Sequence, residues 1–560
     1  MTERQRPVMR GRCLFSWLLV LGIFIGCSKR QNPPPSSQPQ ESTRPASLIR
    51  LHFSGTARIK AETNAAPWVA MGELPASGAL WQQTLGKLAK TPYELLTPRI
   101  MSTNDFAAIF RELITDATRA ESFLEITGHS NRIVESGLAI RLSVDRAEFW
   151  RTNLLAILED WTAIRAEPLR ERLGWELKQS PNVFRLIRAG DWTLLGYGRG
   201  PLALQDEYLR RITESGRLIP TGGDFWLEFF LDGPNLPPDF FTLNSNRVLP
   251  DLGGFFDVSQ GLPKTDLKLS VVESNLRIKG DLIFQDKAFS KPGAWQIPTN
   301  LIRDPIISFA AVRGLPPIPQ HYLERLRLQP GFDANQLFVW AGAGNPMQTL
   351  AAVPVENADL ILANLSPQLI ARFNPLLASH KAGGLIETTN TSGDITLRWV
   401  GVPPFVSPHI STARDSNSDF VVMGTYANSP EANPPPGELF HHLARQPNLM
   451  YYDWELTGPR AWSWRNMINI FRHIFEKPRL RPETASIVWI NSISNQLGNT
   501  VTQITRTDSN RLSLVRQGPV ALTGMELMVL AQWLESPRFP LHGDDLSRRS
   551  GTNLPTSLPR

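Results

Sequence analysis

Cysteine is nearly absent from this 560-residue sequence, which contains only Cys13 and Cys27. Both lie among the first thirty residues, so the rest of the chain cannot form a disulfide or a cysteine-ligated zinc site. A thiol nucleophile is excluded from that part for the same reason. Any chemistry in the body of the protein must therefore use other side chains.

The common motifs of catalysis and metal binding are also missing. The nine histidines are scattered, and no His-Glu-x-x-His segment occurs. The neighbours His441 and His442 would project about 100° apart on a helix, and His542-Gly-Asp-Asp545 lies in a polar tail. There is no complete phosphate-binding loop and no Gly-x-Ser-x-Gly elbow. We therefore predict no catalytic, cofactor-binding or metal-binding residue, although a triad or acid pair assembled from distant residues leaves no such motif.

The net charge of the chain is small once residues 1–26 are left out. The formal net charge is +6, but residues 1–26 contain four arginines and one glutamate. Their removal leaves 54 basic and 51 acidic residues, and no dense basic run with interleaved aromatics follows. We predict no nucleic-acid partner.

The first 26 residues have the features of a secretory signal peptide in the expected order. Basic residues come first, and the apolar stretch 13–25 follows. This stretch is shorter than the about 20 residues that a membrane-spanning helix needs. Its length is typical of a signal-peptide core. We therefore interpret residues 1–26 as a signal peptide.

The segment Phe24-Ile25-Gly26-Cys27 resembles the lipobox of bacterial lipoproteins. In that family the cysteine thiol carries diacylglycerol, and cleavage occurs just before the cysteine. The resemblance implies lipidation of Cys27 and cleavage between Gly26 and Cys27, with Phe24 standing where the family prefers leucine. Ser28 is not the aspartate that commonly retains lipoproteins in the inner membrane. The resemblance thus favours attachment to the outer membrane, facing the periplasm.

Two other interpretations of this segment stay open: an uncleaved anchor helix, and a signal peptide that is cleaved without lipidation. Cys13 has no small residue before it, and we interpret it as an ordinary apolar residue. Residues 27–47 are predicted to be the lipidated cysteine and a disordered Pro/Ser-rich tether. Residues 538–560 are predicted to be a disordered tail.

The body of the chain contains pairs of similar segments that recur in the same order. Strands and turns draw on few residue types, so short matches also arise by chance. We nevertheless predict an internal duplication, with one half at 48–298 and the other at 299–537. The five pairs are Met71–Pro75 with Val312–Pro316, Val144–Leu154 with Val355–Leu365, Asp191–Gly196 with Asp419–Gly424, Phe225–Pro234 with Met450–Pro459, and Glu273–Asn275 with Asp508–Asn510.

Local patterns predict both helices and strands in each half. Apolar residues at helical spacing mark helices around 80–88 and 106–114. Residues 266–271 alternate with period two and then turn at Ser274-Asn275, which predicts a hairpin. Thr523-Gly-Met-Glu526 is a capping box for a helix through Trp533-Leu534. Hairpins mixed with amphipathic helices favour an α+β fold with antiparallel sheets, in two tandem related halves.

The body is also similar to a family of uncharacterised bacterial envelope proteins, a domain of unknown function. The similar segments are a predicted strand at Trp68–Pro75 before the Leu80–Leu88 helix, a predicted strand at Tyr451–Pro459, and the Gln517–Gly524 approach to the last helix. The resemblance covers most of residues 48–537 and implies the fold and the compartment. It implies no activity, because the family has none assigned.

The aromatic side chains of the body can lie either in the core or on the surface. We place Trp150 and Trp161 on a helix, and we place Trp226, Phe229, Phe230, Tyr451, Tyr452 and Trp454 on strands. Such rings bury large areas, so most are expected in the core. A groove that stacks on peptidoglycan sugars or packs against a partner is the alternative.

The sequence therefore predicts a cell-envelope protein, anchored to a membrane by its N-terminal lipid, with a non-enzymatic binding or scaffolding role. An envelope protein or peptidoglycan is the expected partner besides the membrane. Two alternatives stay open. One is an envelope hydrolase, acting on glycan or peptide, without a recognisable motif. The other is a transport or assembly factor for lipid or outer-membrane proteins.

Overall fold

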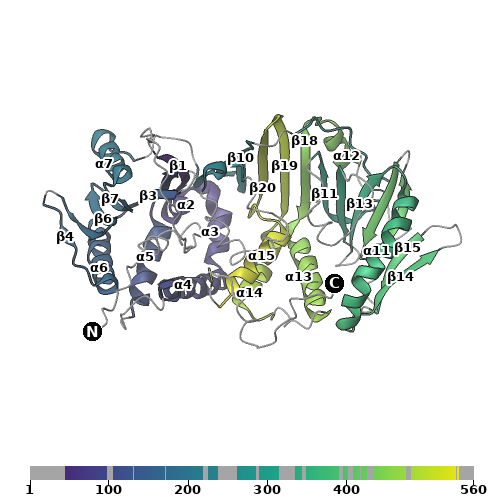
Figure 1. Ribbon diagram of the computed structural model, residues 1–560, viewed down its shortest axis with the longest axis horizontal. Helices are drawn as coiled ribbons and strands as arrows, with labels where there is room; N and C mark the ends of the chain where they lie inside the picture. The colour runs from purple at the N-terminus through teal and green to yellow at the C-terminus, as the bar shows by residue number, and fades with distance from the viewer. Residues whose placement is uncertain are drawn as a thin grey trace, which may run out of the picture. The chain divides into compact units, whose positions relative to one another are not determined.

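The computed structural model describes residues 45–96, 105–129, 132–170, 172–218, 225–236, 262–285, 289–314, 335–343, 348–389, 395–401, 408–415, 418–425, 434, 437–474, 481–537 and 539–540. These residues belong to two compact units, shown in Figure 1. Unit 1 takes in the residues up to Ser274, residues 283–285 and those from Ala531 onward. Unit 2 takes in residues 275–282 and 286–530.

The strands of unit 1 pair antiparallel throughout. Each strand is short, and neighbours in the pairing order are often distant in sequence. In that order they are β4 (Glu167–Pro168), β5 (Gly174–Gln179), β6 (Asn182–Ala189), β7 (Trp192–Arg199), β3 (Arg132–Arg141), β2 (Ser122–His129), β1 (Ala46–Phe53), β8 (Leu227–Asp232) and β9 (Lys264–Val272).

The helices of unit 1 cover both faces of this sheet. A core of buried side chains lies between the sheet and α5 and α6, and a second lies under α7. Trp150 and Trp161 of α6 are buried in the first core, as expected from the sequence. The helices are α2 (Thr56–Ala61), α3 (Ala66–Glu73), α4 (Pro75–Leu96), α5 (Ala107–Arg119), α6 (Val144–Thr162) and α7 (Ala203–Ser215).

The predicted strand at Trp68–Pro75 is wrong, because most of this segment is helix α3. Pro67 lies in the first turn, where its missing N–H costs nothing and its fixed φ favours a helix. Met71 is the buried residue of the helix, and its carbonyl accepts a hydrogen bond from the Ser77 hydroxyl at 2.5 Å. The local backbone preference set by proline therefore overrides the strand-like run of apolar residues.

The predicted edges of the folded body also shift. β1 begins at Ala46, so strand pairing reaches the last two residues that the sequence assigns to the tether. Phe539, assigned to the tail, is buried against Leu85, Leu88 and Ile114 together with Trp533. A large aromatic ring that finds an apolar surface stays out of water, whatever the polarity of its sequence neighbours.

The strands of unit 2 are also antiparallel, and β20 pairs on its other side with β10 (Asn275–Ile283). Figure 1 shows β18, β19 and β20 side by side. In pairing order they are β14 (Gly384–Thr389), β15 (Ile395–Val400), β16 (His409–Asp415), β17 (Ser418–Gly424), β13 (Thr349–Val355), β12 (Gln336–Gly342), β11 (Ile306–Arg313), β18 (Leu449–Leu456), β19 (Asn499–Asp508) and β20 (Arg511–Gly518).

The helices of unit 2 are α11 (Ala358–Ser379), α12 (Gly437–Ala444), α13 (Thr457–Ile474), α14 (Ala485–Ile493) and the start of α15 (Gly524–Glu535). α11 packs against β17 through Ala358, Ile361 and Val421. The capping box of α15 is confirmed, because Thr523 Oγ1 accepts from the Glu526 amide and Glu526 accepts from the Thr523 amide. Among the described residues, no helix combines the length and apolar composition needed to cross a bilayer.

The pairing order of the strands repeats between the two units. In unit 1 the pairing order is β4, β5, β6, β7, β3, β2, β1, β8 and β9. Adding ten to each of these numbers gives the pairing order of the corresponding strands in unit 2. α6 follows β3 as α11 follows β13, and α7 follows β7 as α12 follows β17. Four of the five predicted segment pairs fall on elements at the same place in this order. The first pair does not, since Met71 lies in α3 and Val312 in β11.

Trp150 tests the core of unit 1. The side chain is fully buried, and its Nε1 donates to Asp116 Oδ2 at 2.9 Å. Trp150→Ala should lower the free energy of unfolding by about 3–5 kcal/mol, because it leaves a cavity and removes a buried hydrogen bond. Urea denaturation measures this loss. Trp462→Ala, at a side chain 49% exposed, is the control and should change stability by under about 0.5 kcal/mol. Equal losses in both variants would contradict the assignment of Trp150 to the core.

Candidate functional site

The lipidation site predicted at Cys27, with Gly26 before the cleavage point, lies outside the described residues. His542-Gly-Asp-Asp545 also lies outside them. His441 and His442 are exposed on α12, as expected for a helical pair. Within the described ranges, no group of three or more histidine, cysteine, aspartate or glutamate side chains has the geometry of a metal site.

The structure does bring histidine and carboxylates together in unit 1. His52 of β1 lies between two glutamates: its Nε2 is 3.1 Å from Glu121 Oε1, and its Nδ1 is 3.3 Å from Glu228 Oε2. The hydrogen bond from His52 is the main cause that lowers the pKa of Glu121. An imidazolium can donate to both carboxylates, whereas a neutral ring has one N–H. The arrangement braces β1 against β8 and the start of β2.

A second polar cluster lies on β18 of unit 2. Because side chains alternate along a strand, Tyr452 and Trp454 face the apolar core, and Asp453 and Glu455 face the other way. Glu455 Oε1 accepts from the backbone N–H of Gly524 at 2.6 Å. For Tyr452 and Trp454 of this strand, the choice between core and groove is thus resolved in favour of the core.

Burial perturbs every ionisable group of this cluster. Loss of water raises the pKa of Asp453 to about 6 and that of Glu455 to about 7. The same cause lowers the pKa of Arg460 to about 10. Arg460 donates to Thr349 Oγ1 at 2.9 Å and stacks over the Trp464 ring. An acid pair with raised pKa values is typical of hydrolases, but these carboxylates are buried beside α13 and α15, which favours a structural role.

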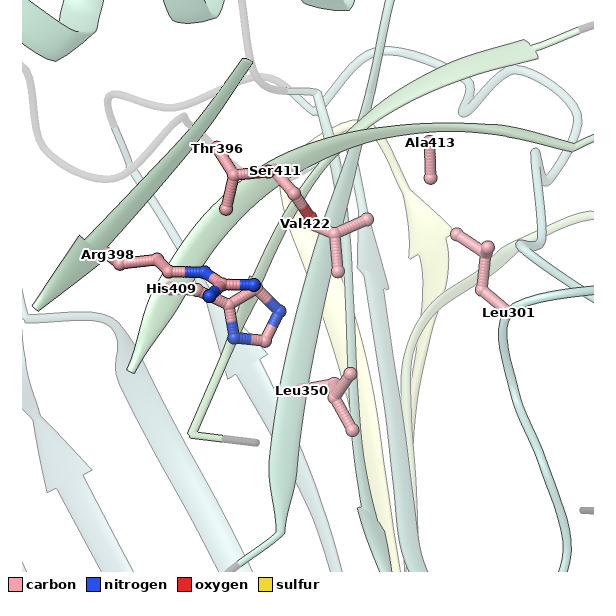
Figure 2. A pocket seen from close by; sticks show the side chains of 8 residues that line it. All are labelled: Leu301, Leu350, Thr396, Arg398, His409, Ser411, Ala413 and Val422. Atoms are coloured by element: carbon pink, nitrogen blue, oxygen red, sulfur yellow. The ribbon is translucent and has the colours of Figure 1, made fainter. Parts of the chain in front are cut away.

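A pocket of about 260 Å³ lies on the sheet of unit 2 (Figure 2). Its floor is apolar, and four polar side chains from two neighbouring strands line one side of it. β15 supplies Thr396 and Arg398, β16 supplies His409, Ser411 and Ala413, and the remaining residues are Val422 of β17, Leu350 of β13 and Leu301.

Strand register explains why these side chains share one face. Thr396 lies directly opposite Ser411, and Arg398 directly opposite His409. Ser411 in turn lies opposite Val422. Side chains directly opposite each other in an antiparallel pair point to the same side of the sheet. The residues between them, such as Ile410 and Val421, face α11 on the other side.

The polar side of the pocket carries a cation without a counter-charge. Arg398 is exposed, and in the described part of the chain its guanidinium has neither a carboxylate nor a hydrogen-bond partner. Figure 2 shows the guanidinium beside the imidazole of His409. Leu350 and Val422 are buried and form the apolar floor. This combination can hold an anionic group at one end and an apolar group at the other.

Reasoning from the sequence missed the pocket. The polar residues of 396–398 and 409–411 alternate with Leu397 and Ile410, and this period of two places them on one sheet face. That alternation was the available signal. The pairing of β15 with β16, which brings Arg398 to His409, is a tertiary feature that no local pattern encodes.

The pH dependence of folding stability tests whether burial holds Glu455 protonated. Its folded-state pKa of about 7 exceeds its ordinary value of 4.5. Between these pH values the unfolded chain loses the proton and the folded chain keeps it, so folding stability falls as pH rises from about 5 to 8. Glu455→Gln keeps an acceptor for Gly524 and should remove roughly 3 kcal/mol of this fall, at about 1.4 kcal/mol per pKa unit.

Urea denaturation of the wild type and of Glu455→Gln at pH 5 and pH 8 measures this effect. The variant should gain stability relative to the wild type as the pH rises. Glu483→Gln, at an exposed glutamate of the same unit, is the matched control and should show no such gain. An equal stability difference at both pH values would show that Glu455 is not held protonated by burial.

No protein-family model, curated protein or solved structure shows significant similarity to this chain. The resemblance to uncharacterised envelope proteins therefore stays a prediction. One of its carrier segments, the Trp68–Pro75 strand, is helical in the structure. The interpretation of the pocket thus depends on the residues of this chain alone.

Proposed function

We propose that this protein is a lipid-anchored cell-envelope protein with a non-enzymatic binding role, and that its ligand occupies the pocket of unit 2. The observation that carries the proposal is the guanidinium of Arg398 beside an apolar floor, with no carboxylate or hydrogen-bond partner among the described residues. A ligand with a negative charge and an apolar surface would complement both the cation and the floor of the pocket.

The corresponding place in unit 1 supports this interpretation. There the sheet face at β6 and β7 is covered by α7, and Arg185 donates to Asp206 Oδ1 at 2.6 Å and to Gln205. Arg185 lies opposite Gly196, as His409 lies opposite Gly424. In unit 2, α12 instead contacts β11 and β18 through Phe440 and His442.

We further propose that the two units arose by internal duplication. The repeated pairing order of β4–β9 and β14–β19 supports this, and so do the similar segments on β7 and β17 and on β8 and β18. On this view the two copies diverged at one place. Unit 1 kept α7 over the sheet face, and unit 2 left that face open for a ligand.

The anchor belongs to the same proposal. Lipidation at Cys27, after cleavage behind Gly26, would attach the chain to a membrane, with the outer membrane facing the periplasm favoured by Ser28. The Pro/Ser-rich residues that follow would serve as a spacer. A binding protein held at this surface would meet small ligands, an envelope protein or peptidoglycan.

Intact mass of the membrane-bound protein tests the anchor. The full-length chain expressed in a Gram-negative host should begin at Cys27 and carry diacylglyceryl and acyl groups. Cys27→Ala should abolish this mass, because the thiol is the acceptor. Cys13→Ala is the matched control and should leave it unchanged. A chain that retains residues 1–26, or one that is cleaved without lipid, would contradict the proposal.

A further inference from the structure

We propose that the pocket of unit 2 selects a monocarboxylate with a straight apolar chain of about six to eight carbons. This inference rests on the proposed binding function and assigns its ligand class. It combines three properties of the pocket: its volume, the chemistry of its floor, and the arginine on its polar side, which has no counter-charge in the described part of the chain.

Volume limits the size of the ligand. A cavity of about 150 Å³ accommodates benzene, which has six carbons. At the same volume per atom, about 260 Å³ accommodates about ten non-hydrogen atoms. Octanoate, with eight carbons and two oxygens, has this size. A phospholipid, a nucleotide or a disaccharide exceeds this volume.

The apolar floor of the pocket disfavours a ligand whose main part is polar. Leu350, Val422, Ala413 and Leu301 offer no hydrogen-bonding side chain to a ligand. A sugar hydroxyl placed there would lose its water without a replacement, which costs free energy. Among the described residues, the lining also contains no tryptophan, tyrosine or phenylalanine on which a sugar or base could stack. An alkyl chain has the matching surface.

The polar side of the pocket determines where the charged end of the ligand binds. A planar guanidinium matches the two oxygens of a carboxylate, and the pair is strengthened by both charges. Arg398 lies opposite His409, whose imidazole is beside the guanidinium, and Thr396 and Ser411 supply hydroxyl groups to the same pocket (Figure 2). This one guanidinium balances one negative charge. The carboxylate therefore lies at β15 and β16, and the chain extends towards Leu350.

Calorimetric titration of octanoate into the full-length protein tests the assignment. The protein is purified in a non-ionic detergent, and a titration of octanoate into the detergent solution alone is the blank. One octanoate per chain should bind, and each methylene removed from the ligand should weaken binding about fourfold. Decanoate should bind no tighter, because the pocket is already full.

Two variants separate the charged end from the apolar floor. Arg398→Gln should weaken octanoate binding about tenfold while leaving 1-octanol unaffected. Ala413→Leu, which fills the floor, should weaken both ligands. Arg445→Gln removes an exposed arginine of the same unit outside the pocket and should change neither. An unchanged far-ultraviolet circular dichroism spectrum verifies that each variant is folded.

Equal octanoate binding by Arg398→Gln and the wild type, or acetate binding as tightly as octanoate, would overturn the ligand class. Native mass spectrometry of protein purified from envelopes then distinguishes the two proposals. A different co-purified small molecule that is lost in Ala413→Leu overturns the carboxylate assignment and leaves the binding function standing. If no molecule co-purifies and octanoate does not bind, both proposals fail.

Discussion

The return of a late strand to an early strand of each unit is the constraint on which the rest of the structure depends. β8 pairs with the free edge of β1, and β18 pairs in the same way with β11. His52 and Glu228 meet across one of these pairs although they are 176 residues apart in sequence. Such a pairing closes a long loop, whose entropic cost grows slowly with length and is offset by the buried strand faces.

In unit 2 this constraint also determines the electrostatics. Once β18 is fixed between β11 and β19, one of its faces meets the apolar core and the other meets the start of α15 and Arg460 of α13. Asp453 and Glu455 are then largely shielded from bulk water, and this burial raises their pKa values. The Gly524 amide and nearby cations reduce the cost of this burial without cancelling it.

The pocket lies at the other end of the same strand order. α11 covers one face of β15–β17, and the opposite face carries Arg398, His409 and Ser411 above an apolar floor. In unit 1, Gln205 and Tyr208 of α7 occupy the corresponding face. Two units with one pairing order therefore differ in whether a helix or a pocket lies on that face.

Sequence patterns by themselves determined the elements that local forces hold. α4, α5 and α15 lie where helical spacing and the Thr523 capping box predicted them, because intrahelical hydrogen bonds and caps involve residues a few positions apart. The α+β class with antiparallel pairing followed from alternation and turns. Helix α3 was missed because apolar residues around Pro67 fit either structure over so short a span.

Only the tertiary structure decided which strands are neighbours, and everything in the two polar clusters and the pocket follows from that choice. Arg398 meets His409 because β15 pairs with β16, and Glu455 is buried because β18 lies between two strands and beneath a helix start. These contacts join residues that local patterns treat as independent. Their energies depend on distance and burial, which the order of residues along the chain does not specify.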